Sequence, residues 1–123
     1  MDEQFYIKQL KSGEDFGKQN PIAGQMANFV YLVGDRVKRE CLVVDPAWDV
    51  EGIVQCANAE GMSIVGALCT HFHPDHVGGD LFGHHVEGLA ELMAINPCKV
   101  YCHPADIPYV KMMTGLSCEG TQV

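Results

Sequence analysis

The first part of the chain alternates hydrophobic and polar positions in a way that predicts β-strands. Gln4 to Lys11 alternates loosely, as an edge strand does, and the polar segment 12–24, which contains Gly and Pro, predicts a loop. The apolar runs 27–33 and 41–44 flank a turn at 34–36. Two such runs around a short turn predict a β-hairpin.

The second part of the chain predicts helices that alternate with strands. Val50, Ile53 and Ala57 have the spacing of one helix face, which predicts a helix over 50–60 that ends at Gly61. The other predicted elements are a strand over 63–70 buried on both faces, a helix over 84–94 stopped by Asn96-Pro97, a strand over 98–102, and a helix over 104–114 that Gly115 ends. We therefore expect an α/β fold, with a mixed β-sheet covered by helices.

Composition narrows the classes of partner. The length of 123 residues, 47% of them hydrophobic, suits one globular domain. The net charge of −8 argues against nucleic acid and anionic membranes as partners. The acidic start, Met1-Asp2-Glu3, has neither the basic end nor the apolar stretch of a signal peptide, so a cytoplasmic location is expected. The six cysteines are then expected to be reduced thiols rather than disulfides.

A cluster of metal-ligating residues follows the apolar run 63–70. His71 and His73 stand two apart at the end of the predicted strand, so in extended backbone both imidazoles point to the same side. Asp75 and His76 come next, and a turn there aims their side chains at a second position close by. Imidazole and carboxylate suit zinc, and also iron or manganese. The spacing predicts two pairs of metal ligands, against the alternative of a solvated polar loop.

The chain resembles the metallo-β-lactamase superfamily, whose motif is His-x-His-x-Asp-His after a buried strand. The segments 28–32 and 42–46 are similar to the family's opening strands, 50–60 to its first helix, and Gly78-Gly79 to its glycine positions. The resemblance covers roughly residues 20–110. It is greatest to the glyoxalase II (hydroxyacylglutathione hydrolase) branch, because true β-lactamases often lack the histidine found here at 76.

The resemblance implies an activity and roles for the residues. His71 and His73 would bind a first metal, Asp75 and His76 a second, and a metal-bound hydroxide would attack the carbonyl carbon of a thioester or small ester. Asp75 would also orient the nucleophile or accept its proton. Asp45, directly before Pro46, would lie behind the ligands and hold the loop; the alternative is a plain strand-end aspartate.

The resemblance also implies that residues 1–123 form only the N-terminal half of an αββα sandwich. The family completes its sites with a later histidine, a bridging aspartate and a last histidine, none of which has a counterpart here, and two histidines alone under-coordinate a catalytic zinc. Half a sandwich leaves an apolar sheet face to be covered. We expect a truncated or cleaved product, with two alternatives: a homodimer, or a missing half supplied by another chain.

Other residues and functions remain open at this point. His103 is interpreted as a capping or core residue, His84 and His85 as the surface start of a helix, and Cys69 as a buried strand thiol, each with metal contact as the alternative. The leading function is a zinc-dependent hydrolase acting on a small-molecule thioester. The alternatives are an oxidoreductase similar to the single-iron persulfide dioxygenases and a non-catalytic metal-binding or interaction module.

Overall fold

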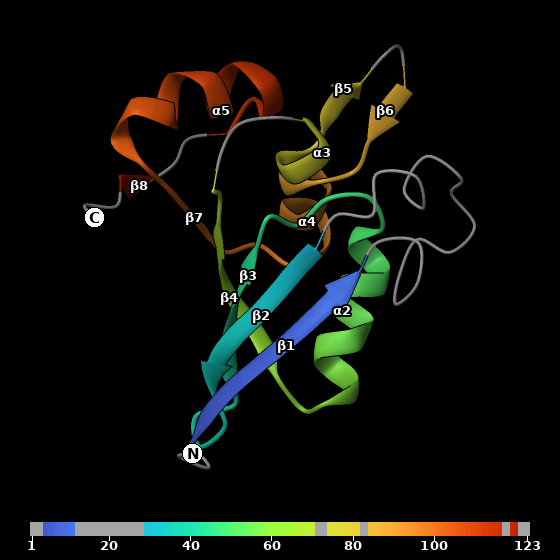
Figure 1. Ribbon diagram of the computed structural model, residues 1–123, viewed down its shortest axis with the longest axis vertical. Coiled ribbons are helices and arrows are strands. Elements are labelled where there is room, and N and C mark those ends of the chain that lie inside the picture. Colours follow the sequence, from blue (N-terminus) through green and yellow to red (C-terminus); the bar gives the residue numbers. More distant parts are fainter. Residues whose placement is uncertain (1–3, 12–28, 71–73, 82–83, 117–118, 121–123) are drawn as a thin grey trace.

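The computed structural model describes residues 4–11, 29–70, 74–81, 84–116 and 119–120 (Figure 1). Its strands are β1 Phe5–Lys11, β2 Phe29–Asp35, β3 Glu40–Val44, β4 Ser63–Leu68, β5 Gly79–Leu81, β6 His84–Val86, β7 Lys99–Cys102 and β8 Glu119–Gly120. Its helices are α2 Val50–Ala59, α3 Pro74–Val77, α4 Leu89–Ile95, the 3₁₀-helix η1 Pro104–Asp106 and α5 Ile107–Thr114.

Six of the strands form one mixed sheet in the order β1-β2-β3-β4-β7-β8. The β1/β2 and β2/β3 pairs are antiparallel, and the pairs from β3 to β8 are parallel. β1 lies at the edge, and β2 and β3 form the predicted hairpin. Because β3, β4 and β7 are parallel, their carboxyl ends meet at one edge of the sheet, where the histidine-rich segment begins. The expected α/β class and mixed sheet are confirmed.

Helix α2 forms where the apolar spacing predicts it. Val50, Ile53 and Ala57 are buried on one face, and the Asp49 side chain caps the helix by accepting a hydrogen bond from the backbone of Gly52 at 3.0 Å. The helix ends before Gly61, whose φ of 72° is in the left-handed region that glycine adopts without strain.

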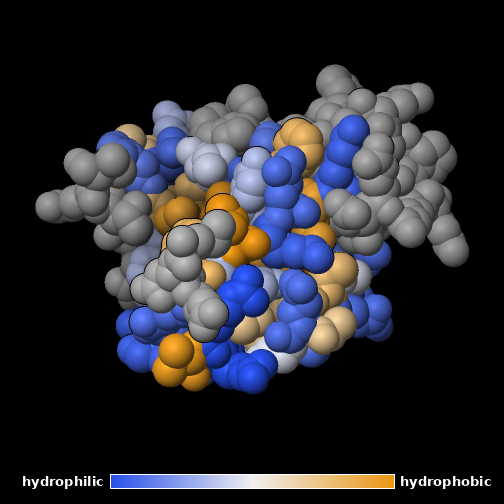
Figure 2. Space-filling model, turned by 60° about the horizontal axis from the view of Figure 1, so that its bottom comes forward, coloured by the Kyte–Doolittle hydropathy of each residue, from blue (hydrophilic) through white to orange (hydrophobic). Residues whose placement is uncertain are grey.

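The far end of α2 is tied to β1 by polar contacts. The Tyr6 hydroxyl donates a hydrogen bond to Glu60, and the Lys8 ammonium lies 3.8 Å from the same carboxylate. The guanidinium of Arg36 stacks over the Tyr6 ring, 5.1 Å from its centre. Figure 2, turned so that the lower end of the molecule comes forward, shows hydrophilic residues with hydrophobic ones between them at this end.

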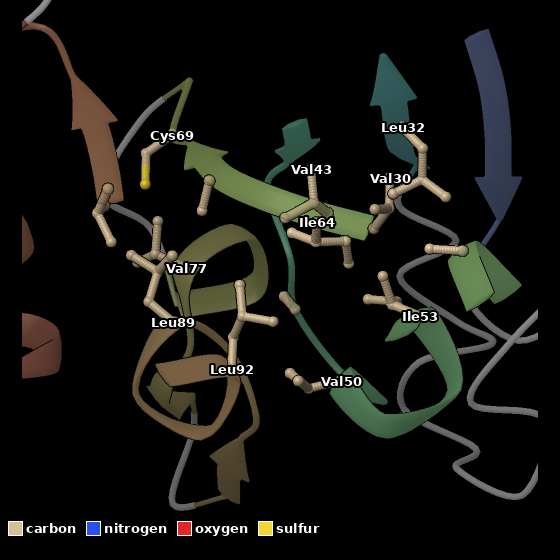
Figure 3. Packing of buried hydrophobic residues seen from close by; sticks show 14 of the residues in the cluster. Val30, Leu32, Val43, Val50, Ile53, Ile64, Cys69, Val77, Leu89 and Leu92 are labelled. Atoms are coloured by element: carbon tan, nitrogen blue, oxygen red, sulfur yellow. The ribbon is translucent and has the colours of Figure 1, made fainter. Parts of the chain in front are cut away.

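The hydrophobic core lies between one face of the sheet and the helices α2 and α4. Figure 3 shows Val50 and Ile53 of α2, with Leu89 and Leu92 of α4, directed toward the sheet residues. On the sheet side the buried residues alternate along the strands, as the pleat requires. The labelled sheet residues are Val30, Leu32, Val43 and Ile64.

The opposite face of the sheet is apolar and open among the described residues. Ile7, Phe29 and Val65 are 52%, 43% and 43% exposed. On the same sheet, a Cβ on Gly66 would lie 2.6 Å from the Leu42 side chain and 3.1 Å from Tyr101, so two large side chains close over that glycine. The expectation that the strand over 63–70 is buried on both faces is wrong at Val65, because the described helices α2 and α4 pack against the other face of the sheet.

The predicted helix over 84–94 is also wrong in its first part. His84–Val86 is strand β6, which pairs antiparallel with β5, and the helix begins only at Leu89. A hydrophobic Val86 followed by Leu89 fits helix spacing, yet the pairing with β5 buries Val86 just as well. The predicted loop over 12–24 lies outside the described residues. None of the helices in the described ranges is long and apolar enough to cross a membrane.

Candidate metal centre

The predicted ligands lie in the segment that follows β4. His71 and His73 fall outside the described residues, and of the next pair the structure describes the backbone of both and the side chain of His76. Asp75 and His76 both lie on α3, the single helical turn Pro74–Val77. The sequence prediction of a turn at this pair is therefore confirmed. Ligation itself stays a prediction for all four residues.

Asp45 joins the strand end to the histidine segment. It follows β3 directly, is only 6% exposed, and its backbone N–H donates to the Leu68 carbonyl of β4 at 2.9 Å. The Oδ1 atom accepts a hydrogen bond from the Thr70 backbone at 2.8 Å, and Oδ2 accepts one from the Thr70 hydroxyl at 2.5 Å. The Nδ1 atom of His76 lies 3.1 Å from Oδ2. Asp45 is thus a buried carboxylate that is hydrogen-bonded to the residues after β4, and its expected place behind bound metal ligands stays a prediction.

The contact with Asp45 fits the tautomer of the His76 ring that carries its proton on Nδ1. A carboxylate can only accept hydrogen bonds, so Nδ1 of His76 is the donor in this pair. In the neutral imidazole the lone pair is then on Nε2, the nitrogen on the far side of the ring. Metal-ligating histidines are commonly oriented by a carboxylate in this way.

The connection from Asp45 to α2 has an unusual backbone. Asp45 has a φ of 55° and Trp48 a φ of 79°, both in the left-handed region that side chains other than glycine rarely adopt. Such residues cost roughly 1–3 kcal/mol each and persist only where surrounding contacts hold them. Asp45 is held by its hydrogen bonds to Thr70 and Leu68. Trp48 is buried, and its backbone N–H donates to the Glu87 carbonyl at 2.8 Å.

Sequence reasoning missed the roles of two residues in this arrangement. Thr70 donates hydrogen bonds to Asp45 from both its backbone N–H and its hydroxyl. Its position as a polar residue between the apolar strand and the first histidine could have indicated this role. Glu87 accepts hydrogen bonds from the connection after Asp45, and no local pattern marks it.

The other candidate ligands take structural positions. His103 caps η1, where its Nδ1 accepts a hydrogen bond from the Ala105 backbone at 3.1 Å, so the capping interpretation is confirmed. His84 and His85 lie on strand β6 and do not open a helix. Cys69 is buried beside the helices, as Figure 3 shows. Within the described residues no group of three or more His, Cys, Asp and Glu side chains is placed to hold a metal ion.

The sequence matches a known family in this same region. Residues 23–81 match the metallo-β-lactamase superfamily. A hydroxyacylglutathione hydrolase of Alkalilimnicola ehrlichii is 38% identical over 79 residues, which are 64% of this chain and 27% of that protein. A probable polyketide biosynthesis zinc-dependent hydrolase of Bacillus velezensis is 27% identical over 110 residues, 89% of this chain and 40% of that protein.

Comparison with solved structures gives a similar result for the fold. A metallo-β-lactamase from Staphylococcus aureus superposes with a TM-score of 0.57 at 20% identity, over 83% of this chain and 24% of that one. The chain therefore has the metallo-β-lactamase fold over the part it contains. It spans less than half the length of each of these proteins. The resemblance inferred from the motif is confirmed.

Proposed function

We propose that this chain, which has the fold and the sequence signature of the metallo-β-lactamase superfamily, carries the first half of the metal centre of a hydrolase. In this proposal His71 and His73 bind one metal ion, and Asp75 with His76 binds a second. The supporting observation is the 3.1 Å contact between Asp45 and Nδ1 of His76. In this contact a buried carboxylate orients the ring of His76, the last residue of the His-x-His-x-Asp-His motif, as carboxylates orient many metal-ligating histidines.

The residues fit a borderline divalent ion in their chemistry. Three imidazoles and a carboxylate are nitrogen and oxygen donors, the set that zinc, iron and manganese accept. The name of the Bacillus velezensis relative supports zinc. When bound, the metal supplies Lewis acidity, which lowers the pKa of a water and polarises the carbonyl of the substrate.

The chain's own residues then have separate tasks. Asp45 holds the proton of His76 at Nδ1 and keeps the ring oriented. Thr70 fixes the strand end in front of His71 through its two hydrogen bonds to Asp45. Asp75 would accept the proton of the attacking water. The substrate proposed is a small thioester or ester, which the names of the hydroxyacylglutathione hydrolase relatives support.

The rest of the centre would come from outside residues 1–123. We propose that these residues form the N-terminal half of an αββα domain, and that the second half completes the ligand set. Two observations support this: the chain matches 27% and 40% of the two relatives, and the open sheet face carries exposed Ile7, Phe29 and Val65. A second half from another chain or from a second copy would meet the same requirement.

Zinc titration of the metal-free chain tests the proposal, with zinc content measured by elemental analysis. The test variant is His76→Asn, and the matched control is His103→Asn, which alters an exposed capping histidine away from the motif. We expect the His76 variant to lose about tenfold or more in zinc affinity and the control to match the wild type. Equal affinities in all three chains would contradict the site.

Assays with metal-loaded protein that contains this chain together with the second half of the domain separate the functions. Hydrolysis of a hydroxyacylglutathione thioester that disappears in the His76 variant supports the hydrolase. Iron bound in one site, together with oxygen consumption, would favour a dioxygenase-like oxidoreductase over the hydrolase. Zinc binding that depends on His76, with no hydrolysis of any thioester or lactone, would leave a metal-binding module.

A further inference from the structure

The junction between β6 and α4, residues Glu87 and Gly88, contacts the connection that follows Asp45. The backbone carbonyl of Glu87 accepts the hydrogen bond from Trp48 at 2.8 Å. The side chain of Glu87 accepts a second one, from the Val50 N–H to Oε1 at 3.2 Å. Val50 is the first residue of α2, so its N–H has no partner within the helix, and Glu87 supplies one from 37 residues away.

The same junction contacts the segment that follows His76. A Cβ on Gly88 would lie 2.1 Å from the Val77 carbonyl oxygen and 2.5 Å from the Gly78 nitrogen. A Cβ on Gly78 would in turn lie 2.8 Å from the Gly88 Cα. The two backbones are therefore in direct contact, at a distance that glycine alone permits. Figure 1 shows α3 beside α4 in this region.

Asp45 and His76 are therefore connected in two ways. One route is the direct hydrogen bond from His76 to Asp45. The other runs from Asp45 along the connection to Trp48, across to Glu87, and through Gly88 to Val77, the residue after His76. The left-handed backbone of Trp48 lies on this route, and strained residues keep their conformation only where neighbours hold them.

We infer that Glu87 is a positioning residue for the metal centre: it holds the connection after Asp45 at a fixed distance from α3 and so keeps Asp45 on Nδ1 of His76. The metal part of this inference rests on the proposed function, whereas the orientation of the ring does not. Hydrogen bonds weaken steeply beyond about 3.5 Å. A drift of about half an ångström between the two segments would therefore release the ring from its 3.1 Å contact.

The test compares three variants in the full chain. Glu87→Ala removes the acceptor for Val50, and Glu87→Gln keeps a carbonyl oxygen at the same place. Ile53→Val loosens the packing of the same helix without touching a polar contact, and is the control for general destabilisation. Glu87→Asp, whose shorter side chain withdraws the acceptor, replaces the alanine variant should that chain fail to fold.

The first readout is the pair of ring-nitrogen chemical shifts of His76 in the metal-free chain at about pH 8, where a histidine of ordinary pKa is neutral. We expect one tautomer, protonated at Nδ1, in the wild type, Glu87→Gln and Ile53→Val, and a mixture of tautomers in Glu87→Ala. The second readout is zinc affinity, expected to fall roughly threefold to tenfold in Glu87→Ala only.

The outcomes separate this inference from the proposed function. A single tautomer in Glu87→Ala, or the same mixture in Ile53→Val, would overturn the positioning role and leave the metal site standing. A wild-type chain that binds no zinc would overturn the metal site, while the chemical shifts still decide whether Glu87 orients His76.

Discussion

Two carboxylates at opposite ends of β3 hold the molecule together in different ways. Asp45 follows the carboxyl end of β3, and Glu60 lies at the other end, where it accepts a hydrogen bond from Tyr6 of β1. The side chain of Asp45 is 7% exposed and that of Glu60 is 38% exposed. The Asp45 side chain contacts Thr70 and His76, which follow β4 in the chain, whereas the Glu60 side chain contacts Tyr6 and Lys8 of β1.

The difference separates the network that the proposed function uses from one that joins secondary-structure elements. At the Glu60 end a phenol, an ammonium and a carboxylate join a helix to an edge strand, and solvent can replace much of that network. At the Asp45 end one buried oxygen, Oδ2, lies within hydrogen-bond distance of both the Thr70 hydroxyl and Nδ1 of His76, and the backbone of Asp45 is in the left-handed region. Strain and burial together at one site are typical of functional centres.

The largest effect is expected from Asp45→Ala. Removing the carboxylate leaves the backbone N–H of Thr70 without its acceptor in a partly buried place, so the free energy of unfolding should fall by about 2–4 kcal/mol. Glu60→Ala, at the exposed end, should lower it by about 1 kcal/mol. Urea denaturation of the metal-free chains measures both.

Asp45→Asn sharpens this contrast. The amide has the shape of the carboxylate, but its nitrogen cannot accept a hydrogen bond from the Thr70 hydroxyl or from His76. Excess zinc should stabilise the wild type and the Glu60 variant through binding to the folded state, and both Asp45 variants much less. Equal stabilisation of all four chains by zinc would remove the functional difference between the two ends.

The sequence was informative about each end to a different degree. Local spacing predicted α2, the β2–β3 hairpin and the helix that ends at Gly115, because each depends on residues close together in the chain. The family resemblance, rather than local spacing, indicated Asp45, and its role behind bound metal ligands stays a prediction. The contact of Glu60 with Tyr6 joins residues 54 apart, and no periodic pattern carries such information.

The errors have the same physical origin. Val86 is buried whether 84–86 is a strand or a helical turn, so burial could not distinguish the two, and pairing with β5 decided it. Val65 was expected to be buried, but exposure of a strand face depends on what packs against it. The contacts of Glu87 with Trp48 and Val50 could not be predicted from the sequence, for the same reason as the contact of Glu60 with Tyr6. Both join residues that are far apart in the chain.

An intermediate, pH-dependent effect is expected from Tyr6→Phe. Burial, and then the hydrogen bond to Glu60, raise the pKa of the Tyr6 hydroxyl above its usual value. Because the pKa is raised in the folded state, this stabilisation is complete below about pH 10, the ordinary pKa of tyrosine, and is lost as the pH rises above it. The wild type should therefore lose stability above about pH 10 more steeply than the variant, which should be about 1 kcal/mol less stable at neutral pH.

Urea denaturation between about pH 8 and pH 11 measures this dependence. Burial raises the pKa of the neighbouring Cys41 thiol to about 11, so the experiment is done in chains that carry Cys41→Ser. Tyr109→Phe, at a tyrosine that is 47% exposed, is the control and should follow the wild type. Parallel curves for the wild type and Tyr6→Phe would show that the Glu60 end does not depend on the neutral phenol.

The smallest effect is expected from Lys8→Gln. The ammonium lies 3.8 Å from the Glu60 carboxylate and both side chains are more than a third exposed, so the free energy of unfolding should change by less than about 0.5 kcal/mol. That small change should disappear at about 1 M salt, where the attraction between exposed charges more than about 3 Å apart is largely screened. Lys99→Gln, at an exposed residue of β7, gives the background for losing one charge. An exposed ion pair is weakened by salt. A loss of unfolding free energy above about 1 kcal/mol that persists in high salt would therefore show that Glu60 depends on Lys8 as strongly as Asp45 is expected to depend on its own partners.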